Sequence, residues 1–380
     1  MDKIRTGIIG TGFIGPVHVE AVRRTCLADV AALAEADEKT ARAKADQLGI
    51  QKAYGDYRML LEDEGIDVVH IAVPNHMHYT VVKEALARGK HVVCEKPLAM
   101  NVDEGRELAS LAHRSGRVCA MNLNCRAYPL VQQVKAMSQA GELGRIFSVG
   151  GSYQQDWLFK ETDYNWRLEP ELSGSSRAVV DIGSHWFDTI EYVTGLRVKR
   201  VCADFATFHP IRRKPRKSLE TYSNKILTAD DYEDIPIKTE DYASVLLRFD
   251  NGGHGSFTAN QVAAGRKNRL YFEIYGSKCS AVFDSEHPNE LLIGHRDGGN
   301  VTMMKDPSLM LDAARGYNSY PGGHTEGFAD TVKHTMLRIY QAIADGRTRG
   351  DFPNFSDGLR ELELCGAICR SAAEEKWIDC

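Results

Sequence analysis

A glycine-rich segment near the start of the chain limits most narrowly what the chain can fold into. Gly10-Thr11-Gly12-Phe13-Ile14-Gly15 follows an apolar run, Ile4–Gly10, and precedes a helical pattern, Pro16–Thr25. Between a strand and a helix, the first glycine permits a tight turn, the second lets the backbone approach a pyrophosphate, and the third allows close helix packing. The segment predicts a dinucleotide-binding turn, and a glycine turn without nucleotide is the alternative. The candidate cofactor contacts here are Gly10, Gly12, Phe13, Ile14 and Gly15.

Short apolar runs and longer helical patterns alternate through this part of the chain, which is typical of parallel βαβ units in a doubly wound sheet. The expected strands are Ile4–Gly10, Asp29–Glu35, Asp67–Val73, His91–Cys94 and Val118–Asn124, and the expected helices are Pro16–Thr25, Glu38–Leu48 and Tyr79–Arg88. A chain of 380 residues with 43% hydrophobic and 26% charged residues is folded and long enough for two domains. We expect an α/β protein with a Rossmann domain at residues 1–125 and a second α/β domain at residues 126–380.

The overall charge and the apolar pattern exclude several classes of protein. A net charge of −5 argues against a general nucleic-acid or anionic-membrane binder. No run approaches the roughly 20 apolar residues that span a bilayer, and Met1-Asp2-Lys3 lacks signal-peptide features, so a cytoplasmic protein is expected. Nine scattered cysteines favour reduced, mostly buried thiols. Cys365 and Cys369 lie one helical turn apart without a second pair at zinc spacing, so we expect them in the core and expect no metal site.

A carboxylate at the end of the second expected strand indicates which dinucleotide is bound. Glu35 lies 20 residues beyond Gly15, where a carboxylate accepts hydrogen bonds from a ribose 2′-hydroxyl and repels a 2′-phosphate. The sequence therefore favours NAD over NADP, although Lys39 lies near enough to weaken that preference and NADP stays open. Asp37 is the alternative for the role of Glu35, because boundaries read from sequence shift by about 2–4 residues.

Two further strand ends carry polar residues where a cofactor would bind, since ligands of open α/β sheets lie at the carboxyl ends of the strands. Glu95-Lys96-Pro97 follows the fourth expected strand. A Glu-Lys pair is usually a surface ion pair, but its place at the cofactor crevice, before a proline, indicates a positioned and catalytic lysine. The cofactor contacts expected at the strand ends are Pro74, Asn75, His78, Glu95, Lys96 and Asn124.

A second candidate group lies in the second half of the chain. Asp181 and His185 are four residues apart, so on a helix they would project from the same face. A histidine that titrates near neutrality can take the hydroxyl proton during hydride removal from an alcohol, and Lys96 would stabilise the developing oxyanion. The alternative is an ordinary buried histidine in the core.

These motifs together resemble the glucose–fructose oxidoreductase / inositol dehydrogenase / rhizopine catabolism (Gfo/Idh/MocA) family, over essentially the whole chain. The resemblance implies a Rossmann domain followed by an α/β domain with a large, open, mostly antiparallel sheet. It also implies hydride transfer between NAD(P) and a carbinol of a sugar, sugar derivative or cyclitol. In that setting Lys96 would bind the reacting hydroxyl, Asp181 would hold the substrate, His185 would be the general acid/base, and Arg126 would lie at the substrate near the domain junction. Relatives suggest a homodimer or homotetramer formed through the C-terminal sheet.

The second half contains alternating strand patterns and a long polar stretch. The expected strands are Ile146–Gln154, Val198–Phe208, Ala243–Phe249, Gly255–Gln261, Leu270–Tyr275 and Ala281–Phe283. Residues 209–240 are expected to form a polar loop, either a solvated excursion or oligomer arm or, alternatively, a phosphate-binding patch. A cluster of basic residues lies near its start: Arg212, Arg213, Lys214, Arg216 and Lys217.

Three more residues are candidate substrate contacts. Trp166 could stack on a sugar ring or anchor its own loop, and Arg167 offers forked donors to hydroxyls. His324 lies in a glycine-rich turn that opens a helix, and helix capping explains the turn nearly as well.

The sequence therefore predicts an NAD-dependent dehydrogenase of a ring secondary alcohol in a cyclitol, sugar or glycoside. One alternative is an NAD-retaining enzyme that cleaves glycosides by transient ring oxidation and elimination. The other is a non-catalytic redox-sensing or partner-binding protein that kept the nucleotide-binding fold, against which Lys96, Asp181 and His185 together argue.

Overall fold

The computed structural model describes residues 3–216 and 231–380, and the chain forms two compact units. The first comprises Met1–Ala127 and Phe328–Leu362, and the second comprises Tyr128–Gly327 and Glu363–Cys380. This division differs from the single boundary expected after residue 125. Phe328–Leu362 returns to the first unit because helix α10 (Phe328–Ala344) packs against α1 (Ile14–Thr25) in a buried apolar cluster. Within the described ranges, none of the helices combines the length and the apolarity needed to cross a membrane.

The first unit is built on a six-stranded parallel sheet with the order β3-β2-β1-β4-β5-β6. Its strands are β1 (Ile4–Ile9), β2 (Ala28–Ala34), β3 (Lys52–Tyr54), β4 (Val68–Ile71), β5 (His91–Cys94) and β6 (Cys119–Met121). The strand order reverses between β1 and β4, which is where doubly wound sheets bind their ligands. The expected parallel Rossmann sheet is confirmed.

Helices cover both faces of this sheet and bury its apolar side chains. They are α1 and α10, with α2 (Glu38–Leu48), α3 (Tyr57–Glu62), α4 (Asn75–Ala87), α5 (Val102–Ser115), the 3₁₀ turn η1 (Asn124–Ala127) and the start of α11 (Phe355–Glu374). One apolar cluster lies under α4 and α5, and a second joins α1 to α10. Strand β3 and helices α3 and α5 are not predicted from the sequence.

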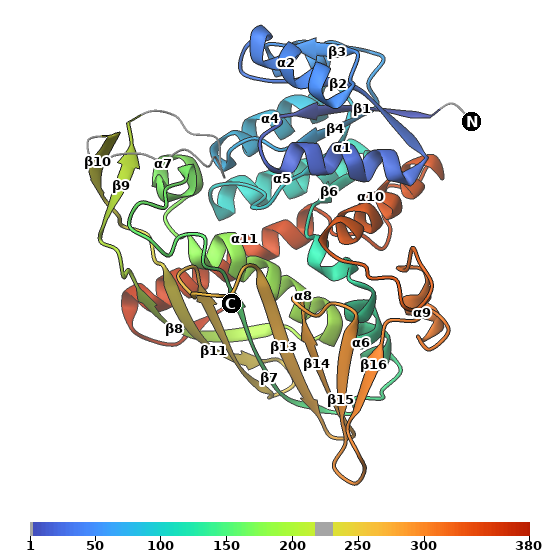
Figure 1. The fold of residues 1–380 in the computed structure, drawn as a ribbon, viewed down its shortest axis with the longest axis vertical. Helices are drawn as coiled ribbons and strands as arrows, with labels where there is room; N and C mark the ends of the chain where they lie inside the picture. The colour runs from blue at the N-terminus through green and yellow to red at the C-terminus, as the bar shows by residue number, and fades with distance from the viewer. Residues whose placement is uncertain (1–2, 217–230) are drawn as a thin grey trace. The chain divides into compact units, whose positions relative to one another are not determined.

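The second unit is built on a nine-stranded, mostly antiparallel sheet, in which only β12 and β7 pair in parallel among the described strands (Figure 1). Its order is β16-β15-β14-β13-β7-β12-β11-β8-β17. The strands are β7 (Ile146–Gln154), β8 (Val198–Ala206), β11 (Tyr242–Phe249), β12 (His254–Asn260), β13 (Arg269–Gly276), β14 (Ser280–Asp284), β15 (Glu290–Gly294), β16 (Val301–Met304) and β17 (Ile378–Asp379). The large open sheet is confirmed, and β15, β16 and β17 were missed.

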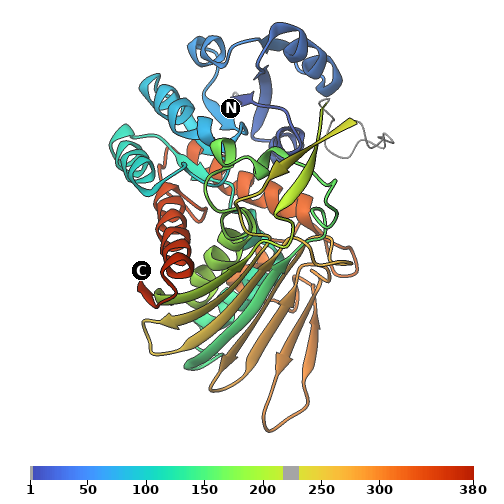
Figure 2. The ribbon, with the colours of Figure 1, turned by 90° about the vertical axis from the view of Figure 1, so that its left-hand side faces the viewer.

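Helices α6 and α8 lie against one face of this sheet (Figure 2). The helical segments of the second unit are α6 (Pro129–Gln139), η2 (Trp166–Leu168), α7 (Pro170–Ser173), η3 (Val179–Gly183), α8 (Ser184–Thr194), α9 (Asp312–Arg315) and the end of α11. Trp186 anchors α8, because its buried indole Nε1 donates to the carbonyl of Tyr271 at 2.9 Å. Gly151 on β7 makes room for that indole, since a Cβ there would lie 2.4 Å from Nε1.

The stretch at residues 209–240 is not simply a polar loop. Strands β9 (Ile211–Pro215) and β10 (Tyr232–Pro236) pair antiparallel on either side of residues 217–230, so Lys217 lies outside the described residues. Arg212 is fully buried against the carboxylate of Asp241, 2.9 Å away. The expectation of a polar loop was wrong because a basic residue such as Arg212 is predicted to be exposed, and no local sequence pattern indicates that a distant carboxylate pairs with it in the interior. The pairing of Arg212 argues against a phosphate-binding role for that residue.

Candidate active site

The three glycines of the N-terminal turn have different surroundings. Gly10 has a φ of +88°, and a Cβ there would lie 2.7 Å from the carbonyl oxygen of Ala72. A Cβ on Gly15 would lie 2.4 Å from the carbonyl oxygen of Gly10, so this glycine lets α1 pack onto the end of β1. A Cβ on Gly12 would meet no atom within 4 Å. The open space at Gly12, beside the N-terminus of α1, fits a dinucleotide pyrophosphate.

Phe13 and Ile14 complete the turn. Phe13 occupies the N-cap position of α1 with its side chain 63% exposed, and Ile14 is the first residue of that helix.

Glu35 and Asp37, the two candidates for the ribose carboxylate, have different surroundings. The backbone N–H of Thr11 donates to Oε1 of Glu35 at 2.5 Å, and the Thr11 hydroxyl donates to the same oxygen. Asp37 instead caps α2, accepting from the N–H of Thr40 at 2.8 Å and from its hydroxyl at 2.7 Å. The Thr40 hydroxyl and N–H lower the pKa of Asp37. This geometry favours Glu35, which faces the glycine turn, as the ribose carboxylate.

His78 links the loops that follow β4 and β5. Its Nδ1 lies 2.6 Å from the carbonyl oxygen of Pro97, and its Nε2 lies 2.9 Å from that of Val73. The ring is 1% exposed, and this burial lowers the pKa of His78. His78, expected at the cofactor, thus braces the loops, whereas Pro74 and Asn75 stand at the N-terminus of α4, where the helix begins after β4.

Glu95 immediately follows β5 and is held as an anion. Its Oε1 is 2.8 Å from Nε2 of His18 and accepts from Nδ2 of Asn122 at 2.6 Å. Burial raises the pKa of Glu95, but the bonds from His18 and Asn122, with the charges of His18 and Lys96, outweigh it and lower the pKa to about 2. The N–H of Lys96 donates to Oε2 at 3.3 Å. The backbone of the candidate catalytic lysine is therefore tied to a fixed carboxylate.

A buried polar chain continues from Glu95 through the first unit. Nδ1 of His18 lies 2.8 Å from Nδ1 of His70, Nε2 of His70 lies 2.9 Å from the Tyr340 hydroxyl, and that hydroxyl lies 2.6 Å from the Thr6 hydroxyl. All four side chains belong to residues that are fully buried. Burial and the neighbouring His18 lower the pKa of His70 well below its ordinary value, and burial raises the pKa of Tyr340.

Asn124 and Arg126 make contacts inside the first unit. Nδ2 of Asn124, an expected cofactor contact, donates to the Thr331 hydroxyl at 2.6 Å. Arg126, an expected substrate contact, donates to Oδ1 of Asp357 at 3.0 Å. These partners come from α10 and α11 and tie η1 to the returning part of the chain.

In the second unit, Asp181 and His185 lie on consecutive helical turns of different type. Asp181 belongs to η3, which is a π-helical turn, and His185 is the second residue of α8. Oδ1 of Asp181 accepts from Nε of Arg167 at 3.1 Å, and Oδ2 accepts from Nε2 of Gln261 at 3.0 Å. His185 is 9% exposed, with its ring 6.1 Å from that of Tyr153. The expected helix is confirmed from Ser184 onward, and π-turns are frequent at functional sites.

Arg167 joins Asp181 to two tryptophans. Its guanidinium carbon lies 4.6 Å from the ring centroid of Trp166 and 5.9 Å from that of Trp157. Its Nη1 donates to Oδ1 of Asn165 at 3.3 Å. The expected substrate pair, Trp166 and Arg167, is thus a stacked cluster beside Asp181, in which Nε and Nη1 of Arg167 contact protein groups.

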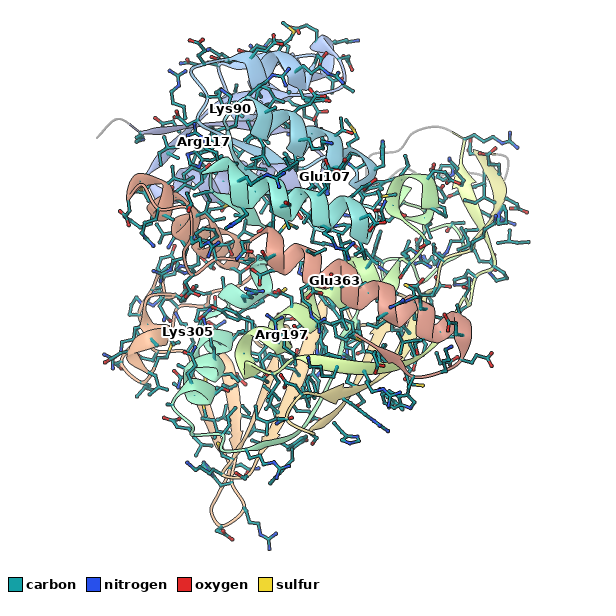
Figure 3. All side chains as sticks on the ribbon, turned by 180° about the vertical axis from the view of Figure 1, so that it is seen from behind. Lys90, Glu107, Arg117, Arg197, Lys305 and Glu363 are labelled. Carbon is teal, nitrogen blue, oxygen red and sulfur yellow. The ribbon has the colours of Figure 1, made fainter. Side chains whose placement is uncertain are left out.

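His324 lies in an exposed turn with a buried anchor. Its Nδ1 is 3.3 Å from the carbonyl oxygen of Gly322. The anchor is the ion pair between Lys305 and Glu326, at 2.7 Å and almost fully buried (Lys305 is labelled in Figure 3). Nζ of Lys305 also donates to the carbonyl oxygen of Tyr320 at 3.1 Å. The turn that presents His324 is therefore fixed before α10 begins.

Sequence reasoning missed the side chains that hold these candidates in place. They are Thr11, His18, His70, Asn122, Arg177, Asp241, Gln261 and Tyr340. His18 carried one signal, since it lies three residues after Gly15 within an otherwise apolar helix face.

The parallel sheet, the three-glycine turn and the carboxylate after β2 define a dinucleotide-binding protein of the Rossmann class. Two family descriptions match this chain: "Oxidoreductase family, NAD-binding Rossmann fold" over residues 4–123, and "GFO/IDH/MocA C-terminal domain" over residues 131–282. The chain belongs to the Gfo/Idh/MocA oxidoreductase family, and its N-terminal part is an NAD-binding domain. The expected family, enzyme class and cofactor are confirmed.

Known proteins resemble the chain over its whole length. The levoglucosan dehydrogenase of Pseudarthrobacter phenanthrenivorans is 30% identical over 393 residues, which cover 100% of this chain and 98% of that protein. A solved structure of levoglucosan dehydrogenase in complex with NADH and levoglucosan is also 30% identical, with a TM-score of 0.89, and the match covers 100% of this chain and 99% of that one. An inositol dehydrogenase homologue of Azotobacter vinelandii, complexed with NAD+, is 24% identical with a TM-score of 0.87 over 100% of this chain and 98% of that one. This last similarity supports the fold alone.

Proposed function

We propose that the protein is an NAD-dependent dehydrogenase of a ring secondary alcohol in a sugar, glycoside or cyclitol. The observation that carries the proposal is the carboxylate of Asp181, held on both oxygens by Arg167 and Gln261, one helical turn before the nearly buried His185. A fixed carboxylate of this kind accepts hydrogen bonds from substrate hydroxyls, and a nearby imidazole takes up a proton near neutral pH. The resemblance to levoglucosan dehydrogenase supports a cyclic sugar derivative as substrate class.

In the proposed reaction each residue has a separate task. The turn formed by Gly10, Gly12 and Gly15 would hold the pyrophosphate of NAD and Glu35 would hold its ribose; NAD would supply the hydride acceptor when bound. Lys96 donates to the oxygen of the reacting alcohol and stabilises negative charge that develops there. Asp181 fixes the sugar through its hydroxyls, and His185 takes the hydroxyl proton on its imidazole.

Replacing His185 with alanine tests whether this residue is the general base. We expect kcat to fall by about 10²–10⁴-fold, because the hydroxyl proton then has no positioned acceptor, while the Kd for NAD stays unchanged. The measurement is steady-state turnover together with NADH binding by fluorescence. The matched control is Thr189→Ala, one turn further along α8, which removes a hydroxyl that donates to the backbone carbonyl oxygen of His185 at 2.7 Å and leaves the imidazole in place. Wild-type kcat in the His185 variant would remove this residue from the mechanism.

The substrate class is tested by nicotinamide reduction with the purified protein. NAD and NADP are each supplied against inositols, free pyranoses, anhydrosugars and aryl glycosides. The proposal expects NADH formation with one class of ring alcohol. Cleavage of a glycoside with no net reduction of nicotinamide would instead establish the oxidation–elimination reaction and overturn the proposal.

The nine-stranded sheet also supports a proposed association of copies, as a homodimer or homotetramer. Four large apolar side chains on its strands are 38–53% exposed: Phe147, Leu246, Tyr275 and Leu292. Light scattering of the wild type and of a Leu246→Glu variant tests this assembly. An unchanged mass in the variant would argue against pairing through this face.

A further inference from the structure

A chain of buried polar side chains runs through the second unit and ends on Asp181. Oδ1 of Asp241 accepts from Nη2 of Arg212 at 2.9 Å and from Nη2 of Arg177 at 2.5 Å. Nη1 of Arg177 donates to Oε1 of Gln261 at 2.8 Å, and Nε2 of Gln261 donates to Oδ2 of Asp181 at 3.0 Å. Four residues of this chain are at most 1% exposed: Arg212, Asp241, Arg177 and Gln261.

The chemistry of arginine fixes which end of the Gln261 amide faces Asp181. A guanidinium only donates hydrogen bonds, so the group that it contacts must be the amide oxygen. The NH₂ end of Gln261 is then directed at the carboxylate of Asp181. A reversed amide would place NH₂ against the guanidinium and the carbonyl oxygen against the carboxylate, which are two repulsive contacts in a buried site.

Arg177 cannot relax away from this position without losing several other bonds. Its Nε donates to the Thr239 hydroxyl at 3.2 Å, and its partner Asp241 also accepts from the N–H groups of Phe208 and His209 at 2.8 and 3.1 Å. Burial raises the pKa of Asp241, but the charge and hydrogen bond of Arg177 help to outweigh it and the pKa is lowered. Breaking a buried pair of this kind leaves an uncompensated charge, which is strongly unfavourable.

We infer that Gln261 is a positioning residue for the proposed catalytic carboxylate, holding Oδ2 of Asp181 while Arg167 holds Oδ1. The inference rests on the proposed role of Asp181 and adds the residue that sets its orientation. A carboxylate bound on both oxygens by donors is restricted in its orientation, which suits a group that accepts hydrogen bonds from substrate hydroxyls.

The charged and titratable groups around Asp181 determine how the site should respond to pH. Arg167 contacts it from η2, Arg177 lies behind Gln261, and His185 follows on α8. Glu240 accepts from the N–H groups of Arg177 and Val179 at 2.9 and 3.0 Å, at the start of η3. Asp241 is paired to two arginines, so its charge is already compensated. A single substitution of Gln261 therefore removes the donor to Oδ2 of Asp181 without breaking that buried ion pair.

The experiment compares Gln261→Glu and Gln261→Met with the wild type in NAD-dependent turnover from pH 5 to pH 9. In Gln261→Glu two carboxylates meet, so we expect the acid limb of kcat/KM to move up by about one pH unit or more. Gln261→Met loses the donor without adding charge, and we expect a smaller shift in the same direction. In both variants the KM for the alcohol should rise at least about tenfold and the Kd for NAD should stay unchanged, because only substrate orientation is affected.

Gln132→Glu is the matched control, because Gln132 is also a buried glutamine of the second unit, on α6, and its Nε2 donates to the Tyr192 hydroxyl at 3.0 Å. This variant should keep the wild-type acid limb. Melting temperatures of all variants give a second readout. Asp181→Asn combined with Gln261→Glu exchanges the amide and the carboxylate, so the double variant should melt at a higher temperature than Gln261→Glu while remaining inactive.

The results separate the inference from the proposed function. If Asp181→Asn is inactive but Gln261→Glu and Gln261→Met keep the wild-type acid limb and KM, the inference is overturned. If Asp181→Asn turns over like the wild type, the proposed role of Asp181 fails and the inference fails with it. If either glutamine variant folds poorly, a double variant no more stable than Gln261→Glu would also overturn the inference.

Discussion

Replacing His18 with alanine tests whether Glu95 is held as an anion in the interior of the first unit. Glu95 has a side chain 12% exposed, and His18 is fully buried beside it. Its pKa falls from an ordinary 4.5 to about 2 because the bonds and charges around it outweigh the opposing effect of burial. At about 1.4 kcal/mol per pKa unit, a difference of about 2.5 corresponds to about 3–4 kcal/mol of stability.

The sign of this linkage sets the pH at which the effect is seen. A carboxylate with a lowered folded-state pKa contributes its stability above pH 4.5 and loses it as the pH falls toward 2. In His18→Ala, Glu95 stays buried without its main partner, so we expect a loss of about 3–5 kcal/mol at pH 7. The loss should shrink near pH 4, where Glu95 can become protonated and neutral.

The assay is urea unfolding of the wild type, His18→Ala, Glu95→Gln and the double variant at pH 7 and pH 4. All four tryptophans lie in the second unit, so the first unit is followed by hydrogen exchange of the β1, β4 and β5 peptides. Because glutamine is neutral, adding Glu95→Gln to His18→Ala should restore about 2 kcal/mol at pH 7. A double variant no more stable than His18→Ala would refute the argument that an unpaired anion causes the loss.

A surface ion pair provides the matched control for this experiment. Nζ of Lys83 lies 2.7 Å from Oε1 of Glu107, with side chains 39% and 46% exposed (Glu107 is labelled in Figure 3). Lys83→Ala should cost less than about 1 kcal/mol, because solvent screens exposed pairs. A loss as large as that of His18→Ala would show that the assay does not report on burial.

The remaining predictions concern the cofactor. Glu35→Ala should raise the ratio of kcat/KM for NADP to that for NAD by at least about tenfold, because the carboxylate that repels a 2′-phosphate is gone; an unchanged ratio in paired assays would transfer the role to another residue. Gly12→Ala should keep the wild-type melting temperature and weaken NAD binding in calorimetry, since a Cβ there meets open space. Gly15→Ala should lower the melting temperature by several degrees because its Cβ would meet the backbone of Gly10; equal melting temperatures of the two glycine variants would contradict this distinction.

The alternating pattern of the sequence predicts most of the Rossmann sheet, because buried parallel strands and amphipathic helices have distinct periods. Helix α2 and strand β5 have the bounds that the pattern indicates, Glu38–Leu48 and His91–Cys94. Strand β3 and helix α3, of three and six residues, are too short to show a period. Helix α5 did carry a signal, since Asn101 caps it through the N–H of Glu104.

The sequence predicts the candidate site residues themselves but not the side chains that hold them in position. Local order placed the glycine turn, Glu35, Lys96, Asp181 and His185 on strand ends and helix starts. The sequence left Glu35 and Asp37 open, and the structure distinguishes them by the bonds of Thr11 to Glu35 and by the cap that Asp37 forms on α2. The supports depend on pairs far apart in the chain, such as His18 with His70 and Arg177 with Asp241. Such pairs form only when the sheet brings distant segments together, so no local pattern indicates them.

In both units a side-chain amide that directly follows a strand donates to a carboxylate. Asn122 directly follows β6 and donates to Glu95, and Gln261 directly follows β12 and donates to Asp181. The backbone N–H of Asn122 donates to the carbonyl oxygen of Cys94 at 2.9 Å, and that of Gln261 donates to the carbonyl oxygen of Asp241 at 3.0 Å. These bonds extend the sheet hydrogen bonding one residue beyond the strand, so each amide starts from a fixed backbone. A side-chain amide on a fixed backbone lowers the entropy cost of orienting a carboxylate, which explains why residues that directly follow a strand carry this task in both units.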